Sequence, residues 1–316
     1  MKWRKLGLIF ESIPENLLDG YIAFAQSPQA IVFDNFIRIF FSTRCLDESN
    51  QFLSHVCFVD FDKQLESLIG TCKKPVIILG GLGCFDEHGI FPINVLRDGD
   101  EILAFITGWT RRKSVPVDAA IGIAISTDNG ISFTRLGEGP VVAPSIYEPF
   151  LVGDGFVIKA GNVYHMWYIS GTRWIMDDNQ QPQRIYKILH ATSEDKITWK
   201  KEGRQIIKDK IDQDECQALP TVIKLQNGYH MFFCYRYATD FRKNPKRAYR
   251  LGYAFSKDGL NWNRDDSNAP EPSDVGWDSE MLCYPHVFEC DNKIYLLYNG
   301  NEFGKHGFGA AMLESM

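Results

Sequence analysis

A repeat of about 64 residues restricts the fold of this sequence more than any other feature. Pro28, Pro92, Pro220 and Pro285 occupy matching positions, and Gly155 takes the same place in "GFVIKAGNVYHM", which parallels "PTVIKLQNGYHM". The steps between these positions are 64, 63, 65 and 65 residues. Such a period is typical of architectures in which one supersecondary unit recurs. Five units account for the 316 residues.

Each repeat contains four short segments with the pattern of a β-strand. In the fourth unit these are "PTVIKL", "YHMFFCYR", "YRLGYAFS" and "LNWNRDD", separated by turn formers such as "QNG" and "KDG". Aromatic and β-branched residues between such turns indicate antiparallel strands. No long segment has the apolar period of a helix. The sequence therefore predicts an all-β fold, a five-bladed β-propeller with four antiparallel strands per blade, formed by residues 1-316 as one domain.

The last unit is shorter than the others. The 32 residues from Pro285 to Met316 hold three strand patterns, "PHVFEC", "KIYLLYNG" and "GFGAAMLE". A sheet edge without a partner favours aggregation. We therefore expect "KLGLIFES", near the N-terminus, to supply the missing outer strand and to close the ring.

Composition excludes several classes of function. The chain is 45% hydrophobic and has a formal net charge of −6, which argues against a nucleic-acid partner because such binding depends on basic patches. The apolar run near the N-terminus is too short for a signal-peptide core, and no run approaches the ~20 apolar residues of a membrane span. We expect neither a nucleic acid nor a membrane as partner.

The cysteines predict free thiols. There are eight, mostly inside apolar strand patterns, with no CxxC pair and no zinc-site spacing. This pattern favours a cytoplasmic protein with buried thiols, and a disulfide framework in an exported protein is the alternative. We expect no cofactor and no metal, although a ring of carboxylates with a histidine could hold Ca²⁺ through oxygen ligands.

A second recurring pattern places a serine two residues before an aspartate. It occurs in "STDNGISF", "SEDKITW" and "SKDGLNW", between the third and fourth strands of a unit. We expect Asp128, Asp195 and Asp258 to make local bonds to the backbone of these turns. The aromatic residues that follow, Phe133, Trp199 and Trp262, are expected to fill the space between blades.

Acidic residues precede the first strand of several units. Glu87, Glu215 and Glu280 each stand five residues before an anchor, so a propeller would place them around one opening at the top of the axis. Two further carboxylates, Glu148 and Asp278, stand seven before an anchor and are expected on the same face, because side chains of an extended chain alternate. Carboxylates that converge in this way repel one another, which raises the pKa of some of them, so that one can act as an acid and another as a base. The alternative for each is that it stabilises its own loop.

The loops after the second strands should form the rim of the same opening. Aromatic rings stack on sugars, and arginines bind carboxylates or phosphates with two hydrogen bonds. If more than two arginines face the pit, an anionic sugar or a phosphate co-substrate becomes the better expectation. The predicted substrate-binding residues of the rim are Arg44, Trp109, Arg173, Trp174, Tyr235, Arg236, Asn301 and His306.

The repeats, the "SKDGLNW" turns and the acidic residues before the first strands resemble the five-bladed glycoside hydrolase superfamily that includes families 43, 32, 68 and 130. The likeness is greatest to uncharacterised members that carry "FDEHG", "SGTRW", "WDSEMLCYP" and "NGNEFGKHGFG" in this order. Family 43 enzymes place a catalytic aspartate immediately before a proline in the first blade, where this sequence has Ser27. The "WMNDPNG" type of motif of family 32 is absent, whereas Glu215-Cys216 resembles the Glu-Cys element of that family's acid.

The resemblance implies an enzyme that acts on glycosidic bonds, with a carbohydrate as partner. Glu215 matches the general acid, and Glu280, Glu87 or Asp86 is expected to supply the base or nucleophile. Two alternatives stay open: a sugar-binding propeller without activity, which Ser27 favours, and a phosphorylase in which arginines and His306 or His286 bind phosphate in place of a base.

Overall fold

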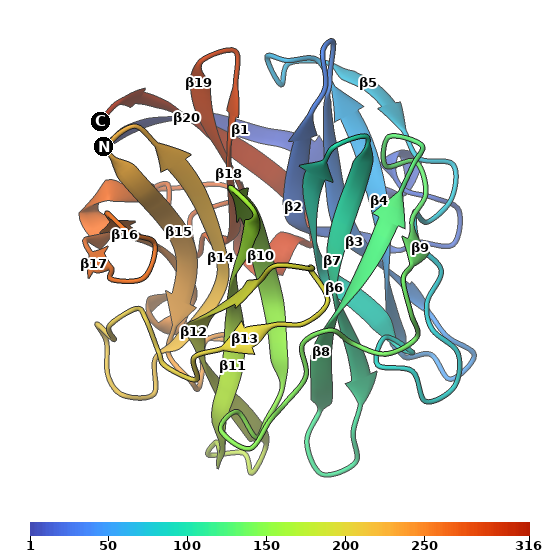
Figure 1. The fold of residues 1–316 in the computed structure, drawn as a ribbon, viewed down its shortest axis with the longest axis vertical. Helices are drawn as coiled ribbons and strands as arrows, with labels where there is room; N and C mark the ends of the chain where they lie inside the picture. The colour runs from blue at the N-terminus through green and yellow to red at the C-terminus, as the bar shows by residue number, and fades with distance from the viewer.

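The structure, a computed structural model, describes residues 1–316. It consists almost entirely of β-strands, as the sequence predicts, with one short helix, α1 (Asn301–Gly304), and three 3₁₀ turns, η1 (Pro14–Asn16), η2 (Pro245–Arg247) and η3 (Asp266–Asn268). The strands form five groups of four, numbered here in chain order. The N- and C-termini lie side by side (Figure 1).

The first two groups belong to one eight-stranded sheet, in which the only link between them is the parallel pairing of Ser54 with Gly89. Every other pairing in the two groups is antiparallel. Group 1 contains β2 (Ala23–Val32), β3 (Ile37–Leu46), β4 (Phe52–Phe61) and β5 (Leu68–Thr71). Group 2 contains β6 (Gly89–Asp98), β7 (Glu101–Arg111), β8 (Val117–Ser126) and β9 (Thr134–Arg135).

The other three groups are separate four-stranded sheets. Group 3 contains β10 (Val152–Ala160), β11 (Val163–Met176), β12 (Pro182–Ser193) and β13 (Lys200–Lys201). Group 4 contains β14 (Cys216–Leu225), β15 (Gly228–Arg236), β16 (Arg250–Ser256) and β17 (Asn263–Arg264). Group 5 contains β18 (Cys283–Cys290), β19 (Lys293–Asn299), β20 (Gly307–Ser315) and β1 (Lys2–Glu11).

The N-terminal strand pairs with the last strand of the chain. β1 runs antiparallel to β20 from Lys2 opposite Ser315 to Glu11 opposite Gly307, so the predicted pairing of the N-terminal segment with the last unit is confirmed. The indole of Trp3 also donates a hydrogen bond to the carbonyl of Asn268 in group 4. No sheet closes on itself, because each keeps two edge strands.

The innermost strands of the groups contact one another in cyclic order, from β2 through β6, β10, β14 and β18 back to β2. Buried polar side chains bridge neighbours in this order. Asn94 on β6 donates to Gln29 on β2 and accepts from the backbone amide of Val157 on β10, while Thr221 on β14 accepts from that of Val287 on β18. These bonds satisfy polar groups that would be costly to bury alone.

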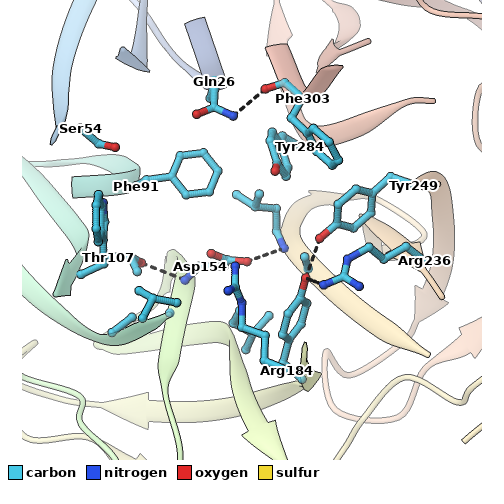
Figure 2. A pocket seen from close by; sticks show the side chains of 18 of the residues that line it. Gln26, Ser54, Phe91, Thr107, Asp154, Arg184, Arg236, Tyr249, Tyr284 and Phe303 are labelled. Atoms are coloured by element: carbon cyan, nitrogen blue, oxygen red, sulfur yellow. Dashed lines mark hydrogen bonds between the residues drawn. The ribbon is translucent and has the colours of Figure 1, made fainter. Parts of the chain in front are cut away.

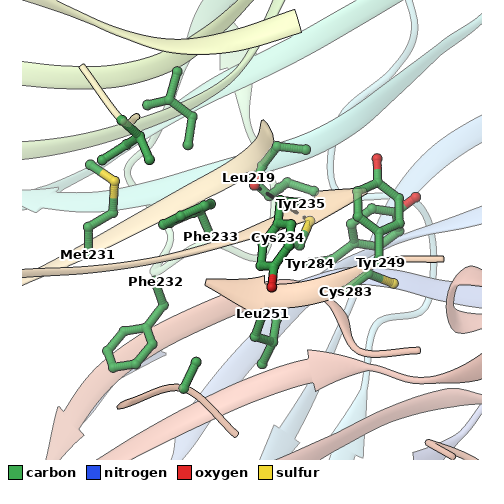
Figure 3. Packing of buried hydrophobic residues seen from close by; sticks show 14 of the residues in the cluster. Leu219, Met231, Phe232, Phe233, Cys234, Tyr235, Tyr249, Leu251, Cys283 and Tyr284 are labelled. Carbon is green, nitrogen blue, oxygen red and sulfur yellow. Dashed lines mark hydrogen bonds between the residues drawn. The ribbon is translucent and has the colours of Figure 1, made fainter. Parts of the chain in front are cut away.

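Apolar side chains fill the space between neighbouring groups. Phe232 and Phe233 are successive residues of β15 and lie on opposite faces of its sheet (Figure 3). A recurring contact joins the turn before an outermost strand, or that strand itself, to the second strand of the preceding group. The ring pairs are Phe133 with Phe40, Trp199 with Phe105, Trp262 with Trp167 and Trp3 with Phe232, at centroid distances of 5.7, 5.8, 6.1 and 5.4 Å. The predicted packing role of Phe133, Trp199 and Trp262 is therefore confirmed.

The Ser-x-Asp turns are local structures, also as predicted. Asp128 accepts from the hydroxyl of Ser126 and the backbone amide of Ser132, and the equivalent bonds recur at Asp195 and Asp258. These bonds hold the pKa of Asp258 far below its usual value, and the backbone amide of Asn261 makes the largest contribution. None of the eight cysteines forms a disulfide, and six are buried.

We predict that deletion of residues 1–12 destabilises the fold and causes aggregation. The deletion removes β1 and leaves the edge of β20 without a partner, and it also removes the Trp3 contact with Phe232. Thermal unfolding and size-exclusion chromatography measure the effect. A truncated protein that stays monomeric and melts at the temperature of the parent would contradict this role of β1.

Candidate functional site

A cavity of about 680 Å³ lies among the innermost strands. Its walls depend on a backbone irregularity that recurs immediately before each repeat anchor, where the pairing register of β2, β6, β10, β14 and β18 shifts. Such bulges redirect a side chain from the regular alternation of a strand. The residues at this position are Ser27, Phe91, Asp154, Leu219 and Tyr284, and the last four line the cavity.

Asp154 is the one acidic residue of this series. It has a φ of 53°, a left-handed conformation that aspartate tolerates better than most residues. Its backbone amide donates to the hydroxyl of Thr107 at 2.8 Å, and its Oδ2 accepts from the backbone amide of Leu219 at 3.1 Å (Figure 2). Oδ1 has no protein partner. The carboxyl group is therefore held in position by its two neighbouring groups of strands.

Burial raises the pKa of Asp154 to about 7, against the opposing effects of the Leu219 amide and the charge of Arg184. The residue is 7% exposed. A carboxyl group with such a pKa is protonated in about half of the molecules at pH 7, and its proton can be donated. The glycines on either side are required by close approach, since a Cβ at Gly153 would lie 2.8 Å from Thr107.

Four arginines line the same cavity: Arg44 on β3, Arg184 on β12, Arg236 at the end of β15, and Arg242 in the following loop. None of them lies within 4.0 Å of a carboxylate oxygen, in contrast to Arg38, Arg135 and Arg264 elsewhere in the fold. Arg236 is buried, Arg44 and Arg184 are half-buried, and Arg242 is exposed. Guanidinium groups that are largely removed from water are normally paired, so the unpaired set gives this cavity a positive lining that is chemically suited to an anion.

Two tyrosines of the cavity lining hold one of these arginines. Arg236, only 2% exposed, donates to the hydroxyl of Tyr186 at 2.9 Å, and that hydroxyl lies 2.6 Å from the hydroxyl of Tyr249 (Figure 2). Its other guanidinium bonds go to the backbone carbonyls of Tyr237 and Ala238. All of these acceptors are neutral, and Nε has no partner.

Four of the residues predicted for the site do line the cavity: Arg44, Trp109, Arg236 and Glu280. Glu280 is exposed, and its carboxylate makes no hydrogen bond or ion pair within the protein. It shares the cavity mouth with Arg242, Glu302 and Lys305. Lys305 and Glu302 are paired at 2.6 Å, which leaves Glu280 as the free carboxylate of the mouth.

The predicted convergence of the other carboxylates is not found. Asp86, Glu148, Glu215 and Asp278 are at most 3% exposed, and none of them lines the cavity. Each is bonded instead to a cation on the outermost strand of its own group. The pairs are Asp86 with Arg135, Glu148 with Lys201, Glu215 with Arg264 and Asp278 with Lys5, at 2.5, 3.0, 2.6 and 2.8 Å.

These four ion pairs are equivalent in the repeat. Arg135, Lys201, Arg264 and Lys5 each stand opposite a fully buried alanine of the neighbouring strand. The small alanine leaves room for the long side chain to reach inward to the carboxylate. The acidic residues therefore bind the two edges of a group together, and this explains why they recur at a fixed distance from the anchors.

The remaining predicted residues also have local partners. Glu87 accepts from the backbone amide of Gly83 in its own loop, and Arg173 pairs with Asp214. Asn301 accepts from the backbone amides of Glu280 and Met281, which orders the loop beside the cavity. Trp174 packs against the core, the ring of Tyr235 faces Arg264, and His306 bonds to Glu302. None of these six residues lines the cavity.

The two histidines considered for phosphate are not in the cavity. Besides His306, the sequence suggested His286, but its ring is buried against Phe156 and Phe288. Burial lowers the pKa of His286 to about 4, so that the ring is neutral at physiological pH.

The most important residue that the sequence analysis missed is Asp154. Its signal was present, because it stands immediately before Gly155 as Ser27 stands before Pro28. The resemblance to family 43 predicts the aspartate in the first unit, where this sequence has Ser27, and not in the third. Arg184, Arg242, Tyr186 and Tyr249 carry no comparable signal, because they reach the cavity from strands and loops at irregular positions.

Comparison with known proteins places the chain in a family. Two proteins of Mycobacterium tuberculosis, Uncharacterized protein MT1551 of strain CDC 1551 / Oshkosh and Uncharacterized protein Rv1502 of strain ATCC 25618 / H37Rv, are each 33% identical to it over 318 residues, which cover the full length of both chains. The chain belongs to the family of these mycobacterial proteins. No family model matches it.

A more distant relative is the β-1,2-mannobiose phosphorylase of Thermoanaerobacter sp. (strain X514). It is 26% identical over 137 residues, which are 41% of this chain and 44% of the phosphorylase. The chain thus spans less than half of that protein in the match.

Solved structures establish the type of fold. A complex of the β-1,2-mannobiose phosphorylase from Listeria innocua with β-1,2-mannobiose superimposes with a TM-score of 0.71 at 12% identity, over 99% of this chain and 97% of the other. A thermostable family-43 glycoside hydrolase gives a TM-score of 0.62 at 14% identity, over 94% and 90%. The fold is that of the glycoside hydrolase propellers related to families 130 and 43.

Neither a metal centre nor a membrane span is evident. No group of three or more histidine, cysteine, aspartate or glutamate side chains is arranged to hold a metal ion. The one helix of the structure is too short to cross a membrane.

We predict that Glu215→Gln destabilises the protein by about 3 kcal/mol, because it leaves a buried guanidinium with only one acidic partner, Asp266. Urea unfolding measures the change. The matched control is Glu87→Gln, which loses one bond in an accessible loop and should cost less than about 1 kcal/mol. Equal stability of the two variants would contradict the structural role of Glu215.

We predict that the free energy of unfolding of the Asp154→Asn variant increases relative to that of the wild type as the pH rises. The folded-state pKa lies above that of the unfolded chain, so the wild type loses stability between about pH 4 and pH 7, by about 4 kcal/mol at 1.36 kcal/mol per pKa unit. The asparagine variant has no such loss. Urea unfolding at pH 5 and pH 8 measures the difference.

The control for this measurement is Asp98→Asn. Lys159 is the first cause that lowers the pKa of Asp98 to about 2, so its contribution is constant between pH 5 and pH 8. A stability difference between wild type and Asp154→Asn that stays constant over this range would mean that Asp154 is ionised in the folded protein throughout.

Proposed function

We propose that the protein cleaves a glycosidic bond by phosphorolysis, with Asp154 as the general acid and inorganic phosphate as the nucleophile. The observation that carries this proposal is a single buried carboxyl group, Asp154, in a cavity with four unpaired arginines. Glycoside hydrolysis requires two carboxyl groups about 5 to 9.5 Å apart. Phosphorolysis needs one acid and a site for phosphate.

The chemistry follows from the protonation state of Asp154. Its carboxyl group donates a proton to the glycosidic oxygen while a phosphate oxygen forms a bond to the anomeric carbon. The bond between that carbon and the glycosidic oxygen breaks, and the products are a sugar 1-phosphate and the shortened glycan. The raised pKa of Asp154 keeps the proton available at neutral pH.

Arg184 and Arg236 are the proposed phosphate ligands. Arg184 lies beside Asp154, whereas Arg236 lies near Tyr249 on another side of the pocket (Figure 2). Arg184 makes no hydrogen bond through its side chain. Guanidinium groups with free N–H donors bind phosphate oxygens with two bonds. Tyr186 fixes the guanidinium of Arg236, which prepares that donor for the anion before it binds.

The relatives support this reading. The protein matched in Thermoanaerobacter and the complex from Listeria innocua are both named β-1,2-mannobiose phosphorylases. The five groups of strands are, in this proposal, the five blades of one propeller domain over residues 1–316, supported by the cyclic contacts of the innermost strands. The eight unpaired cysteines favour a cytoplasmic location.

Hydrolysis is the second candidate because of Glu280. Its carboxylate lines the same cavity and has no partner, so it is free to activate a water molecule opposite Asp154. A structural neighbour with a TM-score of 0.68 and 14% identity is described as coming from the GH130 family of mannoside phosphorylases, which contains glycoside hydrolases.

Turnover with and without phosphate separates the two candidates. A panel of disaccharides that begins with β-1,2-mannobiose is incubated with the protein, and sugar 1-phosphate and free sugar are measured. We predict release of sugar 1-phosphate that requires phosphate, falls as the pH rises through about 7, and is reduced about 100- to 10,000-fold in Asp154→Asn.

Glu280→Gln is the matched variant. It should leave phosphorolysis within a few-fold of the wild type, whereas a hydrolase that uses Glu280 as base would lose its activity. Phosphate-independent release of free sugar that Glu280→Gln abolishes would replace phosphorolysis by hydrolysis. Sugar binding without turnover of any member of the panel would favour the inactive sugar-binding propeller.

A further inference from the structure

The mouth of the cavity contains a second pair of unpaired arginines. Arg44 and Arg242 come from groups 1 and 4, and neither makes a hydrogen bond through its guanidinium group; Nε of Arg44 is buried without a partner. Burial lowers the pKa of Arg44, and the charge of Arg242 adds to this effect. Both guanidinium groups therefore line the same cavity, and neither is paired with a carboxylate.

Both guanidinium groups are supported in the same way. Arg44 lies 4.4 Å from the ring centroid of Phe24 and 5.2 Å from that of Phe52. Arg242 lies 4.3 Å from the ring centroid of Phe241 and 5.6 Å from that of Phe303. Stacking on aromatic faces fixes the plane of an arginine and leaves its N–H donors free.

The backbone at this mouth is strained where the rings are presented. Phe24 has a φ of 76° and Phe303 a φ of 60°. The left-handed conformation is unusual for a bulky residue, and it occurs mostly where a functional arrangement requires it. The two strained residues each present a ring to one of the two arginines.

The charges of the cavity do not balance with phosphate alone. Four arginines line the cavity, and the carboxyl groups of its lining without a cationic partner are those of Glu280 and Asp154, because Glu302 is paired with Lys305. Burial raises the pKa of Asp154 to about 7, so this group carries only part of a negative charge at neutral pH. Between two and three positive charges therefore remain, and a phosphate dianion compensates at most two of them. The excess is notable in a chain whose formal net charge is −6, and it attracts a further negative group.

We propose that Arg44 and Arg242 form a second anion subsite, which binds a permanent negative charge carried by the sugar substrate itself. The substrate class is an anionic saccharide, with a phosphate ester or a carboxylate on the sugar. This inference rests on the proposed function for the identity of the substrate as a sugar. Arg184 and Arg236 remain the site of inorganic phosphate, so both anions bind at once.

Calorimetric titration tests the subsite without turnover. The probes are two matched series, glucose with glucose 6-phosphate and glucuronic acid, and mannose with mannose 6-phosphate and mannuronic acid. We expect at least one charged sugar to bind about tenfold or more tightly than its neutral parent. The phosphorylated and carboxylated members show which anion the subsite prefers. Equal affinity for charged and neutral sugars, or no saturable binding of any charged sugar, overturns the proposal.

Variants locate the charge. Arg44→Gln and Arg242→Gln should each lose about tenfold or more of the affinity for the charged sugar while they still bind inorganic phosphate, which also demonstrates that they are folded. Arg44→Lys keeps the charge without the planar fork and should be intermediate. The matched control is Arg97→Gln, because Arg97 also stacks on a phenylalanine, Phe33, but lies outside the cavity. Wild-type affinity in both glutamine variants overturns the proposal.

Competition distinguishes two subsites from one. Saturating inorganic phosphate should leave the affinity for the charged sugar within about threefold of its value without phosphate. Full competition means that the sugar's anion occupies the phosphate site, and it overturns the second subsite. These binding results do not depend on turnover. A protein that lacks phosphorolysis but prefers charged sugars would contradict the proposed function alone, and a phosphorylase that binds charged and neutral sugars equally would contradict the subsite alone.

Discussion

In four of the five groups of strands, a carboxylate buried ahead of the innermost strand is bonded to a lysine or arginine on the outermost strand. Glu215 with Arg264 is the most buried of these pairs, with side chains that are at most 8% exposed. An ion pair out of water is stable only when geometry and further hydrogen bonds compensate for desolvation, and Glu215 has these bonds from Gln217 and the backbone amides of Lys210 and Ile211. The pairs fix the loop before each innermost strand, and thereby the bulge that follows it.

The bulge is the link between the repeat and the cavity. Each innermost strand turns one side chain out of its regular alternation at the position before the anchor. In four groups the residue at this position is not acidic, and in group 3 it is Asp154. The bulge thus recurs in all five groups, whereas an acidic side chain stands at it only in group 3. Burial raises the pKa of this carboxyl group because it disfavours the ionised form, and this effect exceeds the opposing effects of the Leu219 amide and the charge of Arg184.

The unpaired arginines give the cavity a positive charge. Outside the cavity, Arg38, Arg135 and Arg264 have acidic partners, and their positive charge is compensated. Arg44, Arg184, Arg236 and Arg242 have none, so the cavity carries a positive charge inside a protein of negative net charge. The proposed phosphorolysis and the proposed anionic substrate both follow from this difference. In these proposals Arg184 and Arg236 bind inorganic phosphate, and Arg44 and Arg242 bind the negative group of the substrate.

The sequence by itself determined the strands, the repeat and the role of the N-terminal segment, because alternation, turn residues and a fixed period are local properties of a chain. The cations that pair with the buried carboxylates also follow a sequence pattern, because each stands two residues after an aromatic residue. These cations are Arg135, Lys201, Arg264 and Lys5. Only the tertiary structure decided that the recurring carboxylates face these cations rather than the cavity. Which residues share a cavity depends on how the groups pack around it. Arg184 and Arg242 reach the cavity of Asp154 from positions with no common spacing, and no pattern along the chain predicts that they line the same cavity.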